Sequence, residues 1–174
     1  MKVAIITVNY NGKKDTLEFL ASLKKLRTMN YELLTIIVDN ASTDGSVGAF
    51  KHKYPQVSIL QNGSNKGFAG GYNRGIEYGL IWGADYILII NNDTLIKDPN
   101  LVQELIKTAE SDSKIGLVSP KIYFEKGYEF HKDKYSPKDL GRVIWFAGGR
   151  FDWNNIGSVH RGIDEVDLGQ YDGM

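Results

Sequence analysis

The sequence predicts an α/β protein built on a mostly parallel central sheet. Three observations predict it. Short apolar runs alternate with helical patterns over the first 120 residues, the helical stretches are amphipathic, and three of the apolar runs end in Asn or Asp. This βαβα rhythm favours crossover connections between parallel strands, with helices covering the sheet.

The elements follow in order from their patterns. Strands are predicted at about residues 3–8, 33–38, 57–60, 86–90 and 115–118, and helices at about 14–27, 44–53, 68–81 and 99–111. The first helix carries a leucine every third residue and can cover a sheet. Asp44 is predicted to be the N-cap of the second helix. Asp98 is the expected cap of the fourth helix, with Pro99 at its first position.

The pattern changes after about residue 120. A polar, weakly periodic segment is followed by aromatic runs at 143–146 and 150–153, which Gly148 and Gly149 separate. We expect a flexible loop and then a small hairpin. Residues 1–120 are therefore assigned to the α/β core, and residues 121–174 to a loop and hairpin extension of the same domain.

Composition excludes several classes of protein. A chain of 174 residues with 42% apolar residues can bury a substantial core as one globular domain. Its 21 basic residues balance 21 acidic ones, so nucleic acid is not an expected partner. The absence of cysteine excludes disulfides and thiolate chemistry and fits a cytoplasmic location. No run approaches the roughly 20 apolar residues of a membrane helix.

Polar residues follow three of the predicted strands. They are residues 9–12 after the first strand, 39–45 after the second and 91–93 after the fourth. Asn and Asp are common in turns, so one such end would indicate little. Because open α/β sheets bind ligands outside the carboxyl ends of their strands, three polar ends predict one shared cleft.

These segments contain what a sugar-nucleotide site needs. Tyr10 can stack on a base, Asp39 can accept hydrogen bonds from base or ribose, and Asp93 can hold a divalent metal. Residues 65–75 form a Gly-rich turn into a helix. Four glycines there are costly, at about 0.5–1 kcal/mol each relative to Ala in a helix interior, and imply a close backbone approach or a bent, late-starting helix. Lys66 and Arg74 can supply cations to phosphates.

In order and spacing, residues 8–11, 38–46, 65–75 and 91–93 resemble the signatures of family 2 inverting glycosyltransferases, especially the rhamnosyltransferase-like branch. Residues 145–149 agree more loosely. The resemblance implies a GT-A fold, the Rossmann-like three-layer sandwich of nucleotide-diphospho-sugar transferases. It implies that residues 1–120 are the donor-binding core and that the acceptor-side half is missing.

The resemblance also implies the roles of individual residues. Tyr10 and Asp39 contact the base, and Asp93 binds Mg or Mn that bridges the diphosphate. Asn91 replaces the first Asp of the family's Asp-x-Asp motif, so a single carboxylate is left for the metal. The expected donor-binding residues are Thr7, Asn9, Tyr10, Asp39, Asn40, Ser42, Asn65, Lys66, Gly67, Asn73, Arg74, Asn91 and Asn92.

No catalytic residue is assigned within the chain. In this family an Asp or Glu beyond the metal motif is the general base that deprotonates the acceptor hydroxyl. The late carboxylates lack the expected Glu-Asp context; they are Asp152, Asp164, Glu165, Asp167 and Asp172. We therefore expect the base after Met174, and we expect the isolated chain to bind donor but to transfer sugar poorly or not at all.

The implied reaction transfers a sugar, with inversion, from dTDP-rhamnose or a UDP-hexose to a hydroxyl of a glycan or lipid-linked acceptor, in cell-wall or polysaccharide biosynthesis. A peripheral position at the inner face of the membrane and a homodimer, formed through tryptophans left exposed, are further expectations. Two alternatives stay open. One is a non-catalytic nucleotide-binding or assembly module. The other is a dinucleotide-dependent oxidoreductase, which is weaker because the Gly-rich turn follows the third strand instead of the first.

Overall fold

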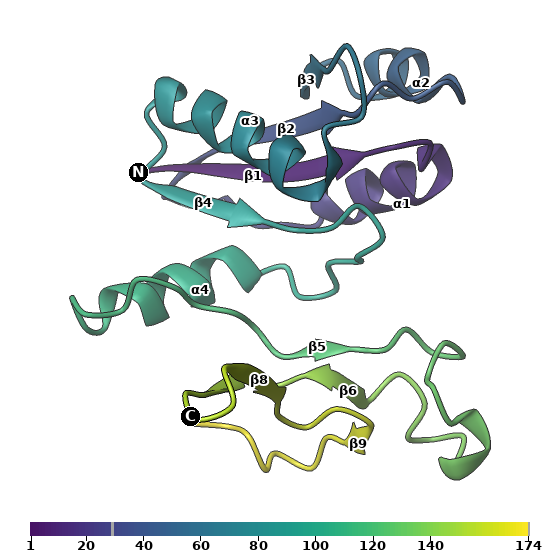
Figure 1. The fold of residues 1–174 in the computed structure, drawn as a ribbon, viewed down its shortest axis with the longest axis vertical. Helices are drawn as coiled ribbons and strands as arrows, with labels where there is room; N and C mark the ends of the chain where they lie inside the picture. Colours follow the sequence, from purple (N-terminus) through teal and green to yellow (C-terminus); the bar gives the residue numbers. More distant parts are fainter. Residues whose placement is uncertain (29, 174) are drawn as a thin grey trace. The chain divides into compact units, whose positions relative to one another are not determined.

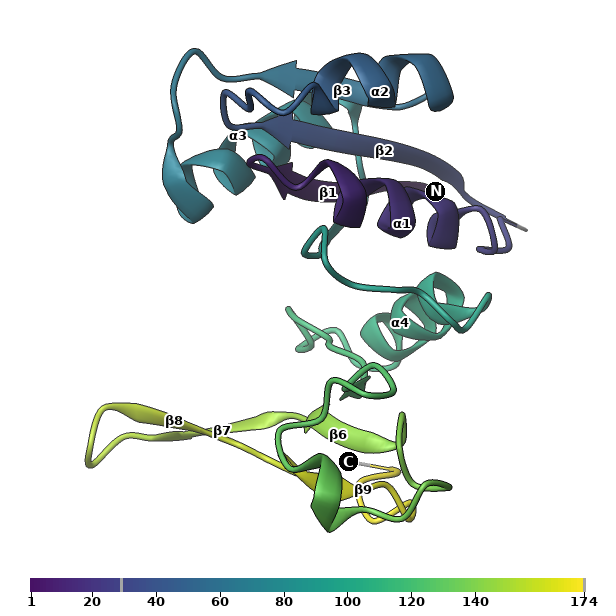
Figure 2. The ribbon, with the colours of Figure 1, turned by 90° about the vertical axis from the view of Figure 1, so that its right-hand side faces the viewer.

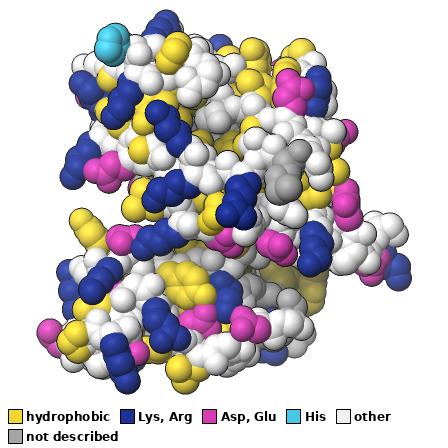
Figure 3. Space-filling model, turned by 180° about the vertical axis from the view of Figure 1, so that it is seen from behind, with side chains coloured by type: hydrophobic (Ala, Val, Ile, Leu, Met, Phe, Trp, Pro, Cys, Tyr) yellow, Lys and Arg dark blue, Asp and Glu magenta, His cyan; other side chains and the backbone are white. Residues whose placement is uncertain are grey.

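The computed structural model describes residues 1–28 and 30–173. The chain forms two compact units, Met1–Ile106 and Lys107–Met174. Within the described residues, no helix is both long enough and apolar enough to cross a bilayer. Basic and acidic side chains are interspersed on the face shown in Figure 3, as the balanced charge predicts.

The first unit is built on a parallel sheet of four strands (Figure 1). These are β1 (Lys2–Asn9), β2 (Glu32–Asp39), β3 (Ser58–Gln61) and β4 (Tyr86–Ile89), in the order β3-β2-β1-β4. Every strand pairing in it is parallel, and Asn9 lies opposite Asp39. The predicted parallel sheet is confirmed, and its first two strands end side by side.

Helices cover both faces of this sheet. Figure 2 shows α1 (Lys13–Leu23) and α2 (Ser46–Lys53) on one face and α3 (Gly67–Trp82) on the other. Ile5 and Ile37 pack on the α1 and α2 side, whereas Ile6 and Ile36 pack with Tyr72 of α3. Successive side chains of a strand point to opposite faces, so an apolar run without alternation fills both cores. The predicted three-layer architecture is confirmed.

Glycines bring α3 into direct contact with the sheet. A Cβ atom on Gly71 would lie 2.8 Å from Cγ2 of Val8, and one on Gly79 would lie 3.1 Å from Cβ of Ala4. A Cβ atom on Gly75 would overlap Ile6. The glycines recur every four residues and so share one helix face. The predicted close backbone approach therefore exists at Gly71 and Gly75, and it is an approach to the sheet.

Helix boundaries depart from the predictions where turns tighten. The first helix ends at Leu23 instead of residue 27, because the next backbone N–H groups bond three residues back, as in a 3₁₀ turn (Lys25 to Ser22, 3.1 Å). The fourth helix, α4 (Leu101–Glu110), starts two residues late. Asp98 and Pro99 form a turn before it, in which the backbone N–H of Asn100 donates to Oδ1 of Asp98 at 2.8 Å.

The strand predicted at 115–118 is wrong. Among the described residues nothing pairs with this run, and the Leu117 side chain is almost fully exposed. A short apolar run becomes a strand only where a neighbouring backbone supplies hydrogen-bond partners. The strands in the described part of the chain supply no such partner to this segment.

The second unit contains two small antiparallel sheets. One joins β5 (Ile122–Tyr123), β6 (Val143–Phe146) and β9 (Glu165–Val166), and the other is the hairpin of β7 (Gly149–Asp152) and β8 (Gly157–His160). A small hairpin follows the loop, as predicted, but its strands are β7 and β8 and not the two aromatic runs. Both edges of β6 are already taken by β5 and β9, so β7 pairs with β8.

A buried carboxylate organises the predicted flexible loop, which also carries the short 3₁₀ helix η1 (Lys132–Lys134). Glu129 accepts hydrogen bonds from the backbone N–H groups of Gly127 (2.8 Å) and Gly141 (2.6 Å). Burial by itself opposes ionisation, but these bonds and the nearby Lys132 hold the pKa of Glu129 below its usual value. The ionised carboxylate thus ties both ends of the loop together.

Candidate functional site

The ends of β1 and β2 are joined by buried side chains. The Asn9 amide donates to Oδ1 of Asp39 at 2.8 Å and to Oγ of Ser42 at 2.9 Å. The backbone N–H of Ser42 donates to Oδ2 of Asp39 at 3.0 Å. Asn9 and Asp39 are both buried, and protein groups engage both oxygens of Asp39. In this arrangement Asp39 shapes the loop after β2 and offers little surface to a ligand.

A second network connects this edge to the start of α3. The Asn40 amide donates to the Gly67 carbonyl at 3.0 Å and accepts from the Asn62 amide at 2.6 Å. The Arg74 guanidinium donates to the Gln61 carbonyl at 2.7 Å and to the side-chain oxygen of Asn62. Arg74 was predicted to meet phosphate, but one of its nitrogens is committed to the loop after β3.

The end of β4 is tied to the end of β1. The Asn92 amide donates to Oγ1 of Thr16 at 2.8 Å, and Thr16 donates in turn to Oδ1 of Asn9 at 2.9 Å. The absence of a side chain at Gly12 makes room for this contact, because a Cβ atom there would lie 2.7 Å from the Asn92 amide nitrogen. The three strand ends predicted to form one cleft are therefore connected through side chains.

Tyr72 supports the residues just before Asp93. Its buried hydroxyl lies 3.0 Å from Oδ1 of Asn91 and 3.0 Å from the Ile90 carbonyl. Burial, together with the negative charge of Asp93, raises the pKa of Tyr72 to about 12. The phenol thus stays protonated and holds the Asn91 side chain from the α3 side.

Other predicted residues lie on the surface. Tyr10 is 55% exposed, and Asn65, Lys66, Asn73, Asn91 and Asp93 are also exposed. Oδ1 of Asn65 accepts from the backbone N–H of Gly67 at 2.8 Å, which supports the left-handed turn at Gly67 (φ 68°). Thr7, by contrast, is fully buried and has no surface for a ligand. Some of the predicted residues are thus buried and hold the loops in place, whereas the others expose their side chains.

Sequence reasoning missed Asn62 and Thr16. Asn62 directly follows β3, so the rule that flagged the other strand ends would also have found it. Thr16 lies inside α1, and nothing in the sequence distinguishes it from an ordinary helix residue.

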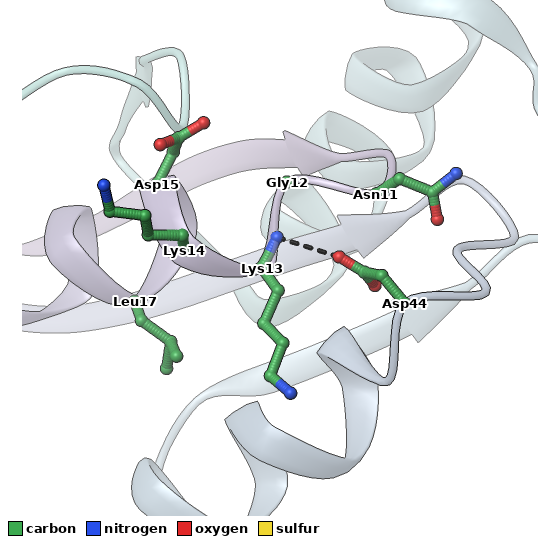
Figure 4. Close-up of a pocket in the computed structure, with 7 residues that line it drawn as sticks. All are labelled: Asn11, Gly12, Lys13, Lys14, Asp15, Leu17 and Asp44. Carbon is green, nitrogen blue, oxygen red and sulfur yellow. Dashed lines mark hydrogen bonds between the residues drawn. The ribbon is translucent and has the colours of Figure 1, made fainter.

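A hollow of about 480 Å³ lies beside this edge (Figure 4). None of the predicted donor-binding residues line it; its lining is Asn11, Gly12, Lys13, Lys14, Asp15, Leu17 and Asp44. The Asp44 carboxylate accepts from the backbone N–H groups of Lys13 (3.0 Å) and Ser46 (3.0 Å), so it caps both α1 and α2. The N-cap position itself is Gly45, which corrects the prediction by one residue.

The hydrogen bonds to Asp44 also explain its ionisation. Desolvation by neighbouring groups opposes the charge, but the Ser46 side chain and the two backbone N–H groups hold the pKa of Asp44 below its usual value.

The carboxylates at this edge are too sparse to enclose a metal ion alone. Among the described residues, no group of three or more His, Asp or Glu side chains could hold one. Asp93 offers one exposed carboxylate at the end of β4. Mg²⁺ is commonly bound by one or two carboxylates together with substrate phosphates and waters, so this donor set fits an ion that arrives with a diphosphate.

The fold and its strand-end site define an open α/β protein of the class that binds ligands at the carboxyl edge of a parallel sheet. The family model described as glycosyl transferase family 2 matches residues 4–165. The chain belongs to this family.

Known relatives agree with this assignment. The chain is 27% identical over 141 residues to an N-acetylglucosaminyl-diphospho-decaprenol L-rhamnosyltransferase of Mycobacterium tuberculosis. That match covers 76% of this chain and 45% of the relative, so the chain spans about half the length of the relative.

Solved structures show the fold. The mannosyltransferase PcManGT of Pyrobaculum calidifontis, in complex with GDP-Man and Mn²⁺, is similar with a TM-score of 0.56 at 21% identity, over 66% of this chain and 33% of that one. TarS 1–349 of S. aureus, in complex with UDP-GlcNAc, gives 0.57 at 20% identity, over 69% and 37%. The fold is therefore GT-A, as the sequence motifs implied.

Proposed function

We propose that this chain carries the donor site of a glycosyltransferase that moves a sugar from a nucleoside diphosphate sugar, dTDP-rhamnose or a UDP-hexose, to a hydroxyl of a glycan or lipid-linked acceptor, with inversion. The observation that supports it best is the connected edge of the sheet. Asn9 and Thr16 link the loops after β1, β2 and β4, and these loops carry the exposed Tyr10 and Asp93.

The two exposed residues suit opposite ends of such a donor. Tyr10 presents an exposed ring that can stack on a pyrimidine, since aromatic rings combine large apolar area with few rotatable bonds. Asp93 presents a carboxylate. Lys66, exposed beside Gly67, can meet phosphate charge. Asp39 and Asn40 then act mainly by holding the base-side loop in shape.

Asp93 would hold Mg²⁺ or Mn²⁺ together with the diphosphate. When bound, the ion supplies Lewis-acid stabilisation of the charge on the departing nucleotide. Asn91 is a neutral amide held by Tyr72, so it contributes no second carboxylate. The complex of PcManGT with GDP-Man and Mn²⁺, on the same fold, supports a divalent ion at such a site.

The isolated chain should bind donor and transfer sugar poorly. The five late carboxylates all accept hydrogen bonds from their neighbours in the second unit; they are Asp152, Asp164, Glu165, Asp167 and Asp172. Asp167, for example, is bound by Lys121 and Tyr123, which hold its pKa down to about 2. A general base needs a pKa near the working pH, so a carboxylate with a pKa this low is a weak base. The rhamnosyl donor and lipid-linked acceptor are supported by the name of the M. tuberculosis relative.

Calorimetry tests the donor site directly. UDP and dTDP are titrated into the 174-residue protein with and without Mn²⁺. We expect binding that Mn²⁺ strengthens, and Asp93→Ala should weaken the Mn²⁺-dependent binding by about tenfold or more. Glu77→Ala is the matched control, because it removes an exposed carboxylate from the middle of α3 and should leave binding unchanged.

Three results would contradict the proposal. Binding of NAD in place of UDP and dTDP would favour the oxidoreductase alternative. If Mn²⁺ strengthened nucleotide binding equally in wild type and Asp93→Ala, Asp93 would not be a metal ligand. Sugar transfer by this chain at ordinary enzyme turnover would place a general base within it.

A further inference from the structure

The β7–β8 hairpin exposes an unusual amount of apolar surface. The turn that joins its strands carries Trp153, 82% exposed, and Ile156, 83% exposed. Phe151 and Val159, in the strands, are each about half exposed. Single exposed apolar residues are ordinary, but four within nine residues on one element form a patch that indicates an interaction site. Figure 2 shows this hairpin extending away from β6 and β9.

The apolar side chains lie on both faces of the hairpin. Arg150 pairs with Val159, and Phe151 pairs with Ser158. Neighbouring residues of a strand point to opposite faces, so Phe151 and Val159 lie on opposite sides, with Trp153 and Ile156 at the tip. A flat protein surface would cover only one side. A medium that surrounds the tip covers all four residues.

Hydrogen bonds fix the turn, and the Trp153 ring packs against the Phe151 ring with 4.3 Å between centroids. The Asp152 carboxylate accepts from the backbone N–H of Asn154 (3.0 Å) and from the side-chain amide of Asn155 (2.8 Å). Ile156 has a φ of 49°, a left-handed conformation that is strained for a β-branched residue. Asn or Gly would meet the needs of the turn without strain. The chain instead places a large aliphatic side chain there, in contact with solvent.

The base of the hairpin is anchored in its own unit. The His160 ring packs edge-on against Trp145 (5.8 Å between centroids) and Phe146 (5.3 Å). The backbone N–H of Ala147 donates to the Arg161 carbonyl at 3.0 Å. The tip can therefore bear on another surface while its base stays fixed.

We propose that the β7–β8 hairpin docks on the surface of a lipid bilayer, with Trp153 and Ile156 at the boundary between headgroups and acyl chains. Tryptophan is favoured at that depth, and interfacial elements bury their apolar side about 5–10 Å. Arg150 is exposed three residues before Trp153, or about 10 Å back along the strand at about 3.3 Å per residue. Val159 pairs with Arg150 and so lies at the same depth. The hairpin would therefore enter the headgroup region as far as this pair, where the Arg150 guanidinium can meet the lipid phosphates. The inference does not depend on the donor site.

Vesicle flotation tests the hairpin. The 174-residue protein is mixed with vesicles of phosphatidylcholine, with and without phosphatidylglycerol. We expect binding to both, and we expect Trp153→Ser/Ile156→Ser to reduce the partition coefficient by about tenfold or more. The matched control is Ile81→Ser/Leu168→Ser, which removes apolar side chains that are 79% and 80% exposed elsewhere and should bind like wild type.

A second variant guards against misfolding of the hairpin. Ile156→Asn introduces a residue that tolerates the left-handed conformation and removes only the apolar group. Reduced vesicle binding by this variant therefore supports the proposal. Equal binding by wild type and the hairpin variants would overturn it, as would no vesicle binding by wild type. A dimer in light scattering that only the hairpin variants dissociate would assign the patch to a second copy. A tryptophan fluorescence response to soluble glycans and not to vesicles, present in wild type and lost in Trp153→Ser/Ile156→Ser, would assign it to sugar.

Discussion

Replacing Gly75 by alanine would put a methyl group into the interface between α3 and the sheet. The new Cβ atom would overlap Cγ2 of Ile6 and lie 3.2 Å from Cγ2 of Val38. Both neighbours are buried and β-branched, so their χ1 angles are stiff and neither can turn aside easily. Either α3 moves away from β1 and β2, or Ile6 leaves its preferred rotamer.

Two opposing effects decide the size of this change. Overpacking of a well-packed core costs about 1–3 kcal/mol. Alanine in place of glycine in a helix interior recovers about 0.5–1 kcal/mol. The expected result for Gly75→Ala is therefore a loss of about 1–2 kcal/mol in the free energy of unfolding.

Gly48→Ala is the matched control, because Gly48 also lies inside a helix but a Cβ atom there would have no atom within 4 Å. It should stabilise the protein by about 0.5–1 kcal/mol. Urea unfolding followed by circular dichroism measures both variants against wild type. A Gly75→Ala midpoint at or above that of wild type would refute the packing argument, because helix propensity alone would then explain both variants.

Three further changes test other contacts. Tyr72→Phe removes the hydroxyl that holds Asn91 and should lower the free energy of unfolding by about 1–2 kcal/mol. It should also weaken the Mn²⁺-dependent binding of UDP. An unchanged UDP affinity in calorimetry would show that Tyr72 does not support the site. Asp44→Ala uncaps two helices and should lower stability by about 1–2 kcal/mol in thermal unfolding, whereas an unchanged Tm would contradict the double cap. The pKa of Asp167 is held down to about 2 chiefly by Lys121, so its contribution of about 1–2 kcal/mol is present above pH about 4 and is lost as pH falls toward 2. Asp167→Asn should flatten that part of the stability profile, and an unaltered profile would exclude the pairing as its cause.

Burial on both faces made the sheet predictable. β1 was predicted at about 3–8 and spans Lys2–Asn9, because each side chain of such a strand needs an apolar environment and the run therefore stands out. The strand at 115–118 and the pairing of β6 with β7 failed for one reason. Strand formation at both places depends on whether a neighbouring strand has a free edge. Residues far away in the sequence decide this, so the local pattern cannot show it.

The polar residues at the strand ends of the candidate site were predictable in type and less so in orientation. Position after a strand identified Asn9, Asp39 and Asp93, but it did not show that the first two are buried. A polar residue at a strand end can point into the loops or into solvent, and the surrounding hydrogen bonds decide between them. Asn62 followed from the same rule, whereas Thr16 required the fold.

The burial of Asn9 is consistent with a binding edge once its hydrogen bonds are considered. Its amide and its side-chain oxygen fix the loops after β1 and β2, and through Thr16 they also fix Asn92, next to Asp93. A site that must present a ring and a carboxylate to the two ends of one ligand needs both held at a constant separation. Exposed side chains on independent loops would lose that separation through loop motion. A shared buried network would preserve it. The same few amides therefore explain why these strand ends are polar and how Tyr10 and Asp93 would be held in the proposed donor site.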